Sequence, residues 1–312
     1  MAHHRTMADV SRRRHSQHGA SAVVGVPPAL LAGLLDDAAT FPPSNADVAD
    51  AVQAREMYAE AWFAELLGAV VVRADRVDGL VAALAGTGVA DRLRAPLPVT
   101  VTVPLGLTAV GDAVRAARRP VLRAVSYEVP LGAGHADAEV LRTVRTLVPD
   151  EAELYVELSS HVDAAVALPE LARAGVRARL RAGGTSANAF PSVEQVARFV
   201  HAAVAARVAF KATAGLHNGL RHRDEDTGFL HHGFLNLLAA TAAALADADL
   251  PDLERLVAAT EPEPVLEVLQ ALDPAGATAV RGALVGIGTC STVEPVEDLA
   301  GLGLLARPGP GE

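Results

Sequence analysis

Short runs of β-branched residues alternate with segments of helical periodicity from about Gly68 onward, and this alternation constrains the fold more than any other feature. Parallel strands need long crossover connections, usually helices, so the alternation predicts a parallel sheet covered by helices. An α/β fold of the (β/α)8 TIM-like barrel type follows. Seven runs predict strands, at residues 70–73, 99–103, 123–129, 154–158, 176–181, 208–213 and 283–287.

The eighth strand is less clearly marked, and the barrel is either complete or open. Residues 22–26 form a short apolar run that could supply the strand, and the alternative is that the strand is missing. Residues 42–69 predict an extra N-terminal helix that covers one end of the barrel. Asn45 would be its N-cap, and Tyr58, Trp62 and Leu66 would share one stripe.

Helix boundaries are marked most clearly in the second half of the chain. Ser192 and Gln195 have the spacing of a capping box, which predicts a helix that begins there. The periodicity predicts further helices at residues 228–246, 253–259 and 265–272, with no strand between the last two.

The chain has 312 residues, and a barrel of this type takes about 250 residues as one domain. We therefore expect a single domain over residues 21–312. Residues 1–20 are rich in His and Arg and lack the apolar segment of a secretory signal, which predicts a disordered N-terminal arm and a cytoplasmic protein. The single cysteine, Cys290, agrees with a reducing compartment.

Charge and hydropathy exclude two classes of partner. The net charge is -10 and the arginines are dispersed along the chain, so no nucleic-acid surface is expected. The longest apolar run, residues 234–246, is too short to cross a bilayer, and no membrane contact is expected. The expected partner is a small anionic metabolite, and a homo-oligomer is left open.

Lys211 is the only lysine, whereas arginine occupies 26 positions. Either residue serves as a surface cation, but a guanidinium cannot lose its proton and attack a carbonyl as an amine can. Lys211 lies in the strand-like run VAFKATAG among apolar and small residues, so its side chain should point inward. Burial near Arg179 or Arg181 would lower its pKa and favour the nucleophilic free amine. The alternative is a structural ion pair with Glu157 or Glu128.

The segment FKATAGL resembles the lysine strand of class I (Schiff-base) aldolases, especially deoxyribose-phosphate aldolase, in which small hydroxylated residues and a glycine follow the lysine. The resemblance covers this strand and the barrel pattern. It implies a (β/α) barrel that joins or cleaves carbon–carbon bonds through an imine on Lys211, with no cofactor. The sequence departs from that family because it has no second lysine on the next strand.

Polar residues two apart on the predicted strands would face the lumen near its upper end. The pairs are Thr100 and Thr102, Ser126 and Glu128, Tyr155 and Glu157, and Arg179 and Arg181. Glu157 or Glu128 would be the general base, and Arg181 would anchor an anion. The alternative is a set of buried salt bridges that only stabilise the barrel.

The loop after the lysine strand places titratable groups where barrel enzymes build their sites. His217 would move protons as a third catalytic residue besides Lys211 and Glu157. Further substrate-binding candidates are Thr185, Arg221, His232 and Asn236.

The segment GIGTCST after the last predicted strand could hold a phosphate on backbone N–H groups near a helix N-terminus. Its candidate residues are Gly286, Gly288, Thr289, Cys290 and Ser291. The alternative is a tight strand-to-helix turn.

Two other functions remain open beside imine chemistry. A metal-dependent hydrolase or lyase would use His217, His222, His231 or His232 as ligands, although no HxH or HExxH spacing occurs and no metal is assigned. A non-catalytic barrel would bind a small metabolite or a partner protein. The first hypothesis is an aldolase-type lyase centred on Lys211.

Overall fold

The structure is a computed structural model that describes residues 22–132, 136–158 and 162–308. The N-terminal arm predicted for residues 1–20 lies outside this part of the chain.

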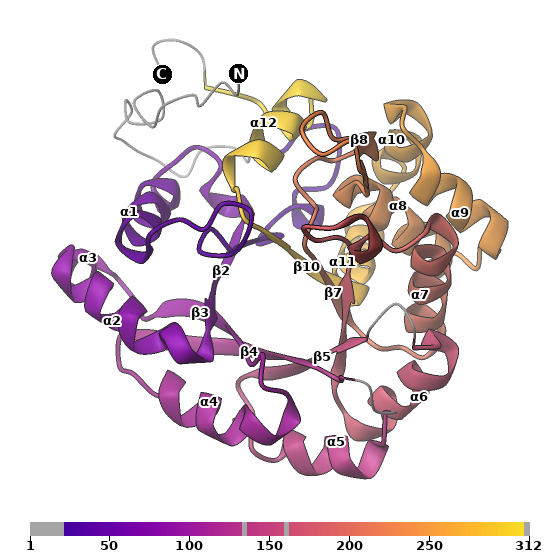
Figure 1. The fold of residues 1–312 in the computed structure, drawn as a ribbon. Coiled ribbons are helices and arrows are strands. Elements are labelled where there is room, and N and C mark those ends of the chain that lie inside the picture. Colours follow the sequence, from indigo (N-terminus) through magenta and orange to yellow (C-terminus); the bar gives the residue numbers. More distant parts are fainter. Residues whose placement is uncertain (1–21, 133–135, 159–161, 309–312) are drawn as a thin grey trace.

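Within the described residues, eight parallel strands close into a barrel in the order β1-β10-β7-β6-β5-β4-β3-β2 (Figure 1). The predicted (β/α)8 barrel is therefore confirmed, and it is complete. The barrel strands are β1 (Leu35–Asp37), β2 (Leu67–Arg73), β3 (Leu97–Thr102), β4 (Leu122–Pro130), β5 (Glu153–Leu158), β6 (Arg177–Arg181), β7 (Phe210–Thr213) and β10 (Leu284–Thr289).

The seven predicted strands correspond to β2 to β7 and β10, but the eighth was misplaced. Val23 forms an isolated antiparallel bridge with Leu305 and is not part of a barrel strand. The eighth strand is β1, which pairs in parallel with β10 on one side and β2 on the other. It has three residues and no β-branched side chain, so its two neighbours determine its conformation more than local propensity does.

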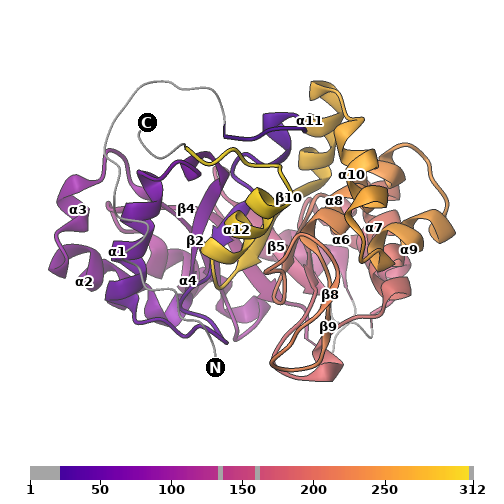
Figure 2. The same cartoon turned by 90° about the horizontal axis from the view of Figure 1, so that it is seen from above.

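Helices form a ring outside the strands (Figures 1 and 2). They are α1 (Val48–Ala59), α2 (Val77–Gly86), α3 (Val89–Arg92), α4 (Val110–Ala117), α5 (Ala138–Arg145), α6 (Ala164–Ala174), α7 (Val193–Ala205), α8 (Phe234–Leu245), α9 (Leu250–Ala258), α10 (Pro262–Gln270), α11 (Pro274–Ala283) and α12 (Val293–Gly301). Short 3-10 helices lie at Pro28–Leu30, Ala64–Leu66, Ala74–Arg76, Leu107–Ala109 and Ala187–Ala189. The capping box of Ser192 and Gln195 begins α7 as predicted. No helix in the described ranges has the length and apolar character needed to span a membrane.

The predicted N-terminal helix is shorter than the pattern indicated. Its N-cap is Asp47, whose side chain accepts a hydrogen bond from Ala49 N, and it ends at Ala59. Asn45 is not the cap, because its backbone is left-handed with φ of 46°. The chain must leave the helix before residue 67, where β2 joins the barrel.

A small antiparallel sheet precedes α8 where a helix was expected from residue 228. Its strands are β8 (His222–Arg223) and β9 (Leu230–His231), and α8 begins only at Phe234. The predicted absence of a strand between residues 253–259 and 265–272 is confirmed, because α9 is followed directly by α10.

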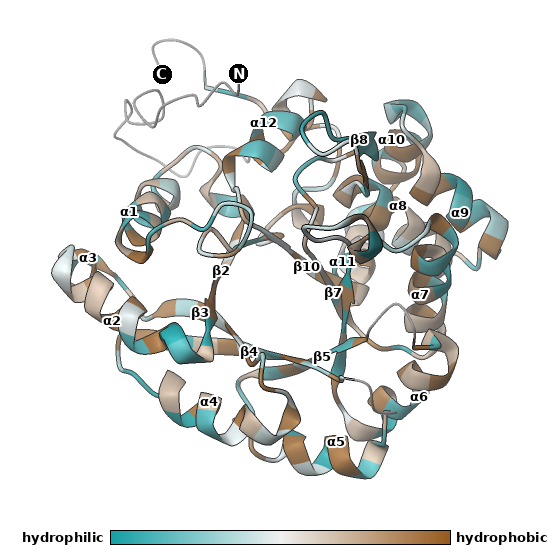
Figure 3. Ribbon diagram, viewed as in Figure 1, coloured by the Kyte–Doolittle hydropathy of each residue, from teal (hydrophilic) through white to brown (hydrophobic). Residues whose placement is uncertain are grey.

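The apolar core lies mainly between the strands and the helix ring, and the lumen of the barrel is largely polar. Figure 3 shows hydrophilic residues among the hydrophobic ones along strands such as β5 and β7. Burying polar groups is costly unless they pair with one another. The buried polar residues on the barrel strands include Asp36, Thr100, Ser126, Glu128, Lys211 and Thr213.

Candidate active site

Lys211 lies in the lumen at the second position of β7, and 5% of the residue is exposed. Its Nζ donates to Asp36 Oδ2 at 2.7 Å and to the hydroxyls of Thr100 and Ser126 at 3.1 and 3.2 Å. Glu128 Oε1 lies 3.4 Å away. Strands β1, β3, β4 and β7 therefore converge on one nitrogen, which has two carboxylates and two hydroxyls as partners.

Tyr155 of β5 closes another side of this group. Its ring centroid lies 5.0 Å from Lys211 Nζ, within the range of a cation–π contact. The Tyr155 hydroxyl accepts a hydrogen bond from Arg177 Nη1 at 3.1 Å, and Arg177 Nη2 lies 2.6 Å from Glu153. These contacts join β5 and β6 beside the lysine group.

The expected lowering of the Lys211 pKa is wrong. Burial alone would lower the pKa, but the charges of Asp36 and then Glu128 outweigh burial and raise the pKa above its ordinary value. The arginines that were expected to act on Lys211 pair with carboxylates instead. The resting side chain is an ammonium, so nucleophilic chemistry needs a proton acceptor beside it.

Arg179 lies next to this group, in register with Lys211 on the neighbouring strand. Its Nε donates to Thr213 Oγ1 at 2.9 Å and lies 3.3 Å from Glu128 Oε2. Its Nη1 lies 3.1 Å from Glu157 Oε2. Arg179 is therefore neutralised by two carboxylates, and Glu157 binds arginine.

Exposure rises along β6 toward its carboxyl end. The side chain of Arg179 is 15% exposed, and that of Arg181, two residues further on, is 49% exposed. Arg181 lies 3.9 Å from Glu157 Oε1, and its Nε donates to Gly183 O. Arg181 is less neutralised by carboxylates than Arg179 and lies nearer the open end of the barrel. This position agrees with the anion-binding role predicted for Arg181.

The predicted glycine loop is for the most part strand. Gly286, Gly288 and Thr289 belong to β10, where backbone groups form the ladder with β7 and β1, so only Cys290 and Ser291 lie in the following loop. Glycine is typical of turns and strand ends, but here β10 continues through Gly288 to Thr289. A Cβ on Gly286 would lie 3.9 Å from Lys211 Cε, an ordinary van der Waals distance, so this glycine lies beside the lysine.

His217 meets Cys290, although they are 73 residues apart in the chain. His217 Nε2 lies 3.5 Å from Cys290 Sγ, and Nδ1 lies 2.7 Å from Glu294 Oε2. Burial opposes protonation of the imidazole, but Cys290 and Glu294 outweigh it and raise the pKa of His217 to about 10. A thiol, an imidazole and a carboxylate thus lie in line beyond the ends of β7 and β10.

Two other predicted substrate-binding residues, His232 and Asn236, are buried and use their polar atoms on neighbouring protein groups. His232 is 1% exposed, with Nε2 at 2.7 Å from Pro191 O and Nδ1 at 3.2 Å from Arg221 Nη1. Asn236 is fully buried and uses its amide on the backbone of Arg221, Leu256 and Ala259. Thr185 is exposed in the β6–α7 loop.

The four histidines considered as metal ligands do not all meet. In the described part of the chain, His222 and His231 come together with Asp224, and their ligand atoms lie within 4.8 Å of one another. Neither His217 nor His232 belongs to that group.

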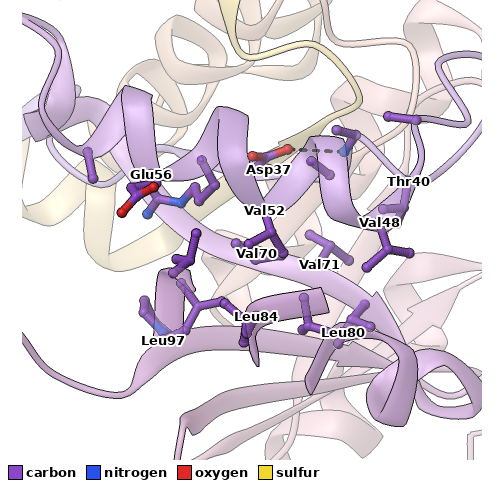
Figure 4. Close-up of a pocket in the computed structure, with 18 of the residues that line it drawn as sticks. Asp37, Thr40, Val48, Val52, Glu56, Val70, Val71, Leu80, Leu84 and Leu97 are labelled. Atoms are coloured by element: carbon purple, nitrogen blue, oxygen red, sulfur yellow. Dashed lines mark hydrogen bonds between the residues drawn. The ribbon is translucent and has the colours of Figure 1, made fainter. Parts of the chain in front are cut away.

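A cavity of about 1040 Å³ lies against β2 between α1 and α2 (Figure 4). Val52, Val70, Leu80 and Leu84 line its apolar part. Lys211 does not line this cavity, so it is separate from the polar lumen.

Asp36 is the main site residue that the sequence analysis missed. Thr100, Ser126, Tyr155 and Arg179 were expected to face inward, but Asp36 belongs to the unrecognised strand β1. The available signal was the pair of acids that directly follows the apolar segment LLAGLL. Acids at the end of a buried run are typical of strand ends in a barrel site.

The fold and the lumen define the class: a (β/α)8 barrel protein with one lysine buried among carboxylates and hydroxyls. The sequence matches no family model and no curated protein. Among solved structures, the fold is similar to "QR15, an Aldolase" at 14% identity and a TM-score of 0.43, covering 88% of this chain and 97% of that one. It is also similar to the YdjI aldolase from Escherichia coli K12, at 14% identity and a TM-score of 0.34, covering 76% and 86%. These similarities are remote.

Proposed function

We propose that this protein is a lyase of the class I aldolase type, in which Lys211 forms an imine with a small anionic oxo-substrate. The supporting observation is the position of Lys211 Nζ inside the lumen, 2.7 Å from Asp36 and within 3.2 Å of two hydroxyls. A surface cation needs no such setting. A buried ionisable group with specific charged partners is the arrangement that enzymes use to control a reacting amine.

Asp36 is the proposed acceptor for the lysine proton. Its Oδ2 takes a proton from the ammonium, and the free amine then adds to the substrate carbonyl carbon. The carbinolamine loses water to give an iminium ion. A hydroxyl on the carbon β to the iminium carbon then loses its proton and the bond between the α and β carbons breaks, so that its electron pair forms an enamine and the β carbon leaves as the carbonyl of the first product. Protonation of the resulting enamine and hydrolysis of the imine release the second product and regenerate Lys211.

Neighbouring groups support this sequence through position and charge. Thr100 and Ser126 orient Nζ through their hydroxyls, and Glu128 offers a second carboxylate. Arg181, half exposed toward the open end, would hold the anionic group of the substrate. Glu157 and His217 are the proposed groups for taking the proton from the substrate hydroxyl and for returning a proton to the enamine carbon.

The choice of residue supports the same proposal. Arginine fills every other basic position in the chain, including position 179, where it meets Glu128 and Glu157. Lysine stands at position 211, between Asp36 and Glu128. The resemblance of FKATAGL to the lysine strand of class I aldolases implies the same role.

The test is reductive trapping. The protein is incubated separately with small oxo-acids and phosphorylated or free aldehydes, reduced with borohydride, digested and mapped by mass spectrometry. We expect an adduct on Lys211 with at least one class. The chain has only one other amine, at its N-terminus, so Lys211→Arg provides the matched control and should abolish the peptide adduct at residue 211. If no carbonyl class labels Lys211 above the level on the N-terminal amine, the imine proposal is wrong. Lys211, Asp36 and Glu128 would then be an ion-pair network that stabilises the barrel.

A further inference from the structure

A second cluster of ligand-forming side chains lies on the hairpin between β7 and α8. His222 and His231 are cross-strand partners in β8 and β9, and their ring centroids lie 5.4 Å apart at 58°. Asp224 follows β8, and one ligand atom from each residue lies within 4.8 Å of the others. Two imidazoles and a carboxylate are thus brought together by a turn of a few residues.

Each of the three groups keeps a ligand atom available. His222 Nδ1 lies 3.1 Å from Leu220 O, which places the ring proton on Nδ1 and leaves the Nε2 lone pair free. Asp224 Oδ1 accepts from Thr227 N at 2.8 Å and from its hydroxyl at 2.6 Å, so Oδ2 remains for another partner. A carbonyl on the second nitrogen of a histidine is the usual support of a metal ligand.

His231 gives the independent indication of a missing ligand. Its Nε2 is buried and has no hydrogen-bond partner among the described residues. Its ring stacks on Phe190 with centroids 4.6 Å apart at 29°, so the ring plane is fixed. A buried, unpaired ring nitrogen costs free energy that a bound cation would recover.

We propose that His222, Asp224 and His231 form a mononuclear Zn²⁺ site. An ion about 2 Å from two ring nitrogens in tetrahedral geometry places the ring centroids about 5 Å apart, which agrees with the observed separation. Mixed nitrogen and oxygen ligands of this kind suit Zn²⁺ better than Mg²⁺ or Ca²⁺, which prefer oxygen. Three protein ligands leave a fourth position for water or a substrate oxygen.

The site would fix the hairpin beside the open end of the barrel. Phe190 lies against the glycines that follow β6 and β7: a Cβ on Gly183 would lie 2.6 Å from its ring, and one on Gly215 3.1 Å. The ring that orients His231 is therefore packed on the carboxyl ends of two barrel strands. This inference is independent of the proposed imine chemistry, because Lys211 is not a ligand.

The test uses the full chain, stripped with EDTA and titrated with Zn²⁺ against a chromogenic chelator. We expect one equivalent per chain, and substitution by Co²⁺ should give the visible absorption of tetrahedral cobalt. His222→Ala, Asp224→Asn and His231→Ala should each weaken binding by about 10-fold or more. Circular dichroism checks that these variants remain folded, which we expect because the hairpin lies outside the barrel core.

Two control variants distinguish this site from other histidines. His201→Ala removes an exposed histidine of α7, and a double variant replaces His3 and His4 by Ala. Both should bind Zn²⁺ as the unaltered chain does. Binding that survives all three ligand variants, binding lost with His3 and His4, or less than about a tenth of an equivalent on the unaltered chain would each overturn the proposal.

Discussion

Lys211 is governed by two opposing effects, and their balance sets its chemistry. Removal from water disfavours the ammonium, whereas two carboxylates within 3.4 Å favour it, and the carboxylates dominate. The lysine is therefore not a free nucleophile at rest. In the proposed mechanism it becomes one when Asp36 accepts the proton.

Asp36→Asn tests this balance directly. The variant keeps the shape and an acceptor oxygen but removes the charge nearest to Nζ, so the pKa of Lys211 should fall. Because the chain has one lysine, its side-chain resonance can be followed by NMR during a pH titration without assignment. Asp75→Asn, at an exposed ion pair with Arg73, is the control and should leave the titration of Lys211 unchanged. An unaltered lysine titration in Asp36→Asn would mean that Asp36 does not hold the ammonium.

His217 predicts a pH dependence of stability. Its pKa is about 10 in the folded chain against 6.5 as the ordinary value, so the folded state binds more protons between these values. The stabilisation is fully present below about pH 6.5 and is lost as pH rises through about 10.

His217→Gln should therefore reduce the free energy of unfolding most at neutral pH and little above pH 10. Denaturant unfolding of both proteins across this range measures the difference. A difference that stays constant with pH would show that Cys290 and Glu294 do not hold the imidazolium.

At the scale of elements, β1 is the shortest barrel strand and supplies Asp36. Its Leu35 is fully buried and pairs with β10 and β2. Leu35→Ala should lower the free energy of unfolding by about 2–5 kcal/mol because it leaves a cavity in the core. Leu105→Ala, at a leucine that is 83% exposed, is the matched control and should change it by no more than about 0.5 kcal/mol. Equal effects of the two substitutions would show that residues 35–37 are not part of the barrel.

Elements with a strong periodic pattern were predictable, and those formed by tertiary contacts were not. Residues 99–103, for example, alternate between valine and threonine, which is the pattern of a strand. β1 lacks this pattern and is made by its neighbours, and β8 and β9 have two residues each, too few to show a period. The proposed set of metal ligands was missed in part for the same reason, since Asp224 joins the histidines only when the hairpin forms.

For the whole molecule, the barrel followed from the alternation of strand and helix patterns, and the inward position of Lys211 followed from the apolar and small residues around it. The partners of Lys211 did not follow. Which residues from β1, β3 and β4 reach one nitrogen depends on strand register and barrel closure, which no local pattern determines. The contact between His217 and Cys290 likewise joins two loops that only closure brings together.

The most direct test of the central claim uses the single lysine, labelled with nitrogen-15 at Nζ. The free protein should give one ammonium signal from Lys211. Addition of a carbonyl substrate class identified by trapping should convert that signal into an iminium signal, and Asp36→Asn should change the pH at which this happens. An ammonium signal that stays unchanged with every oxo-acid and aldehyde would contradict the account.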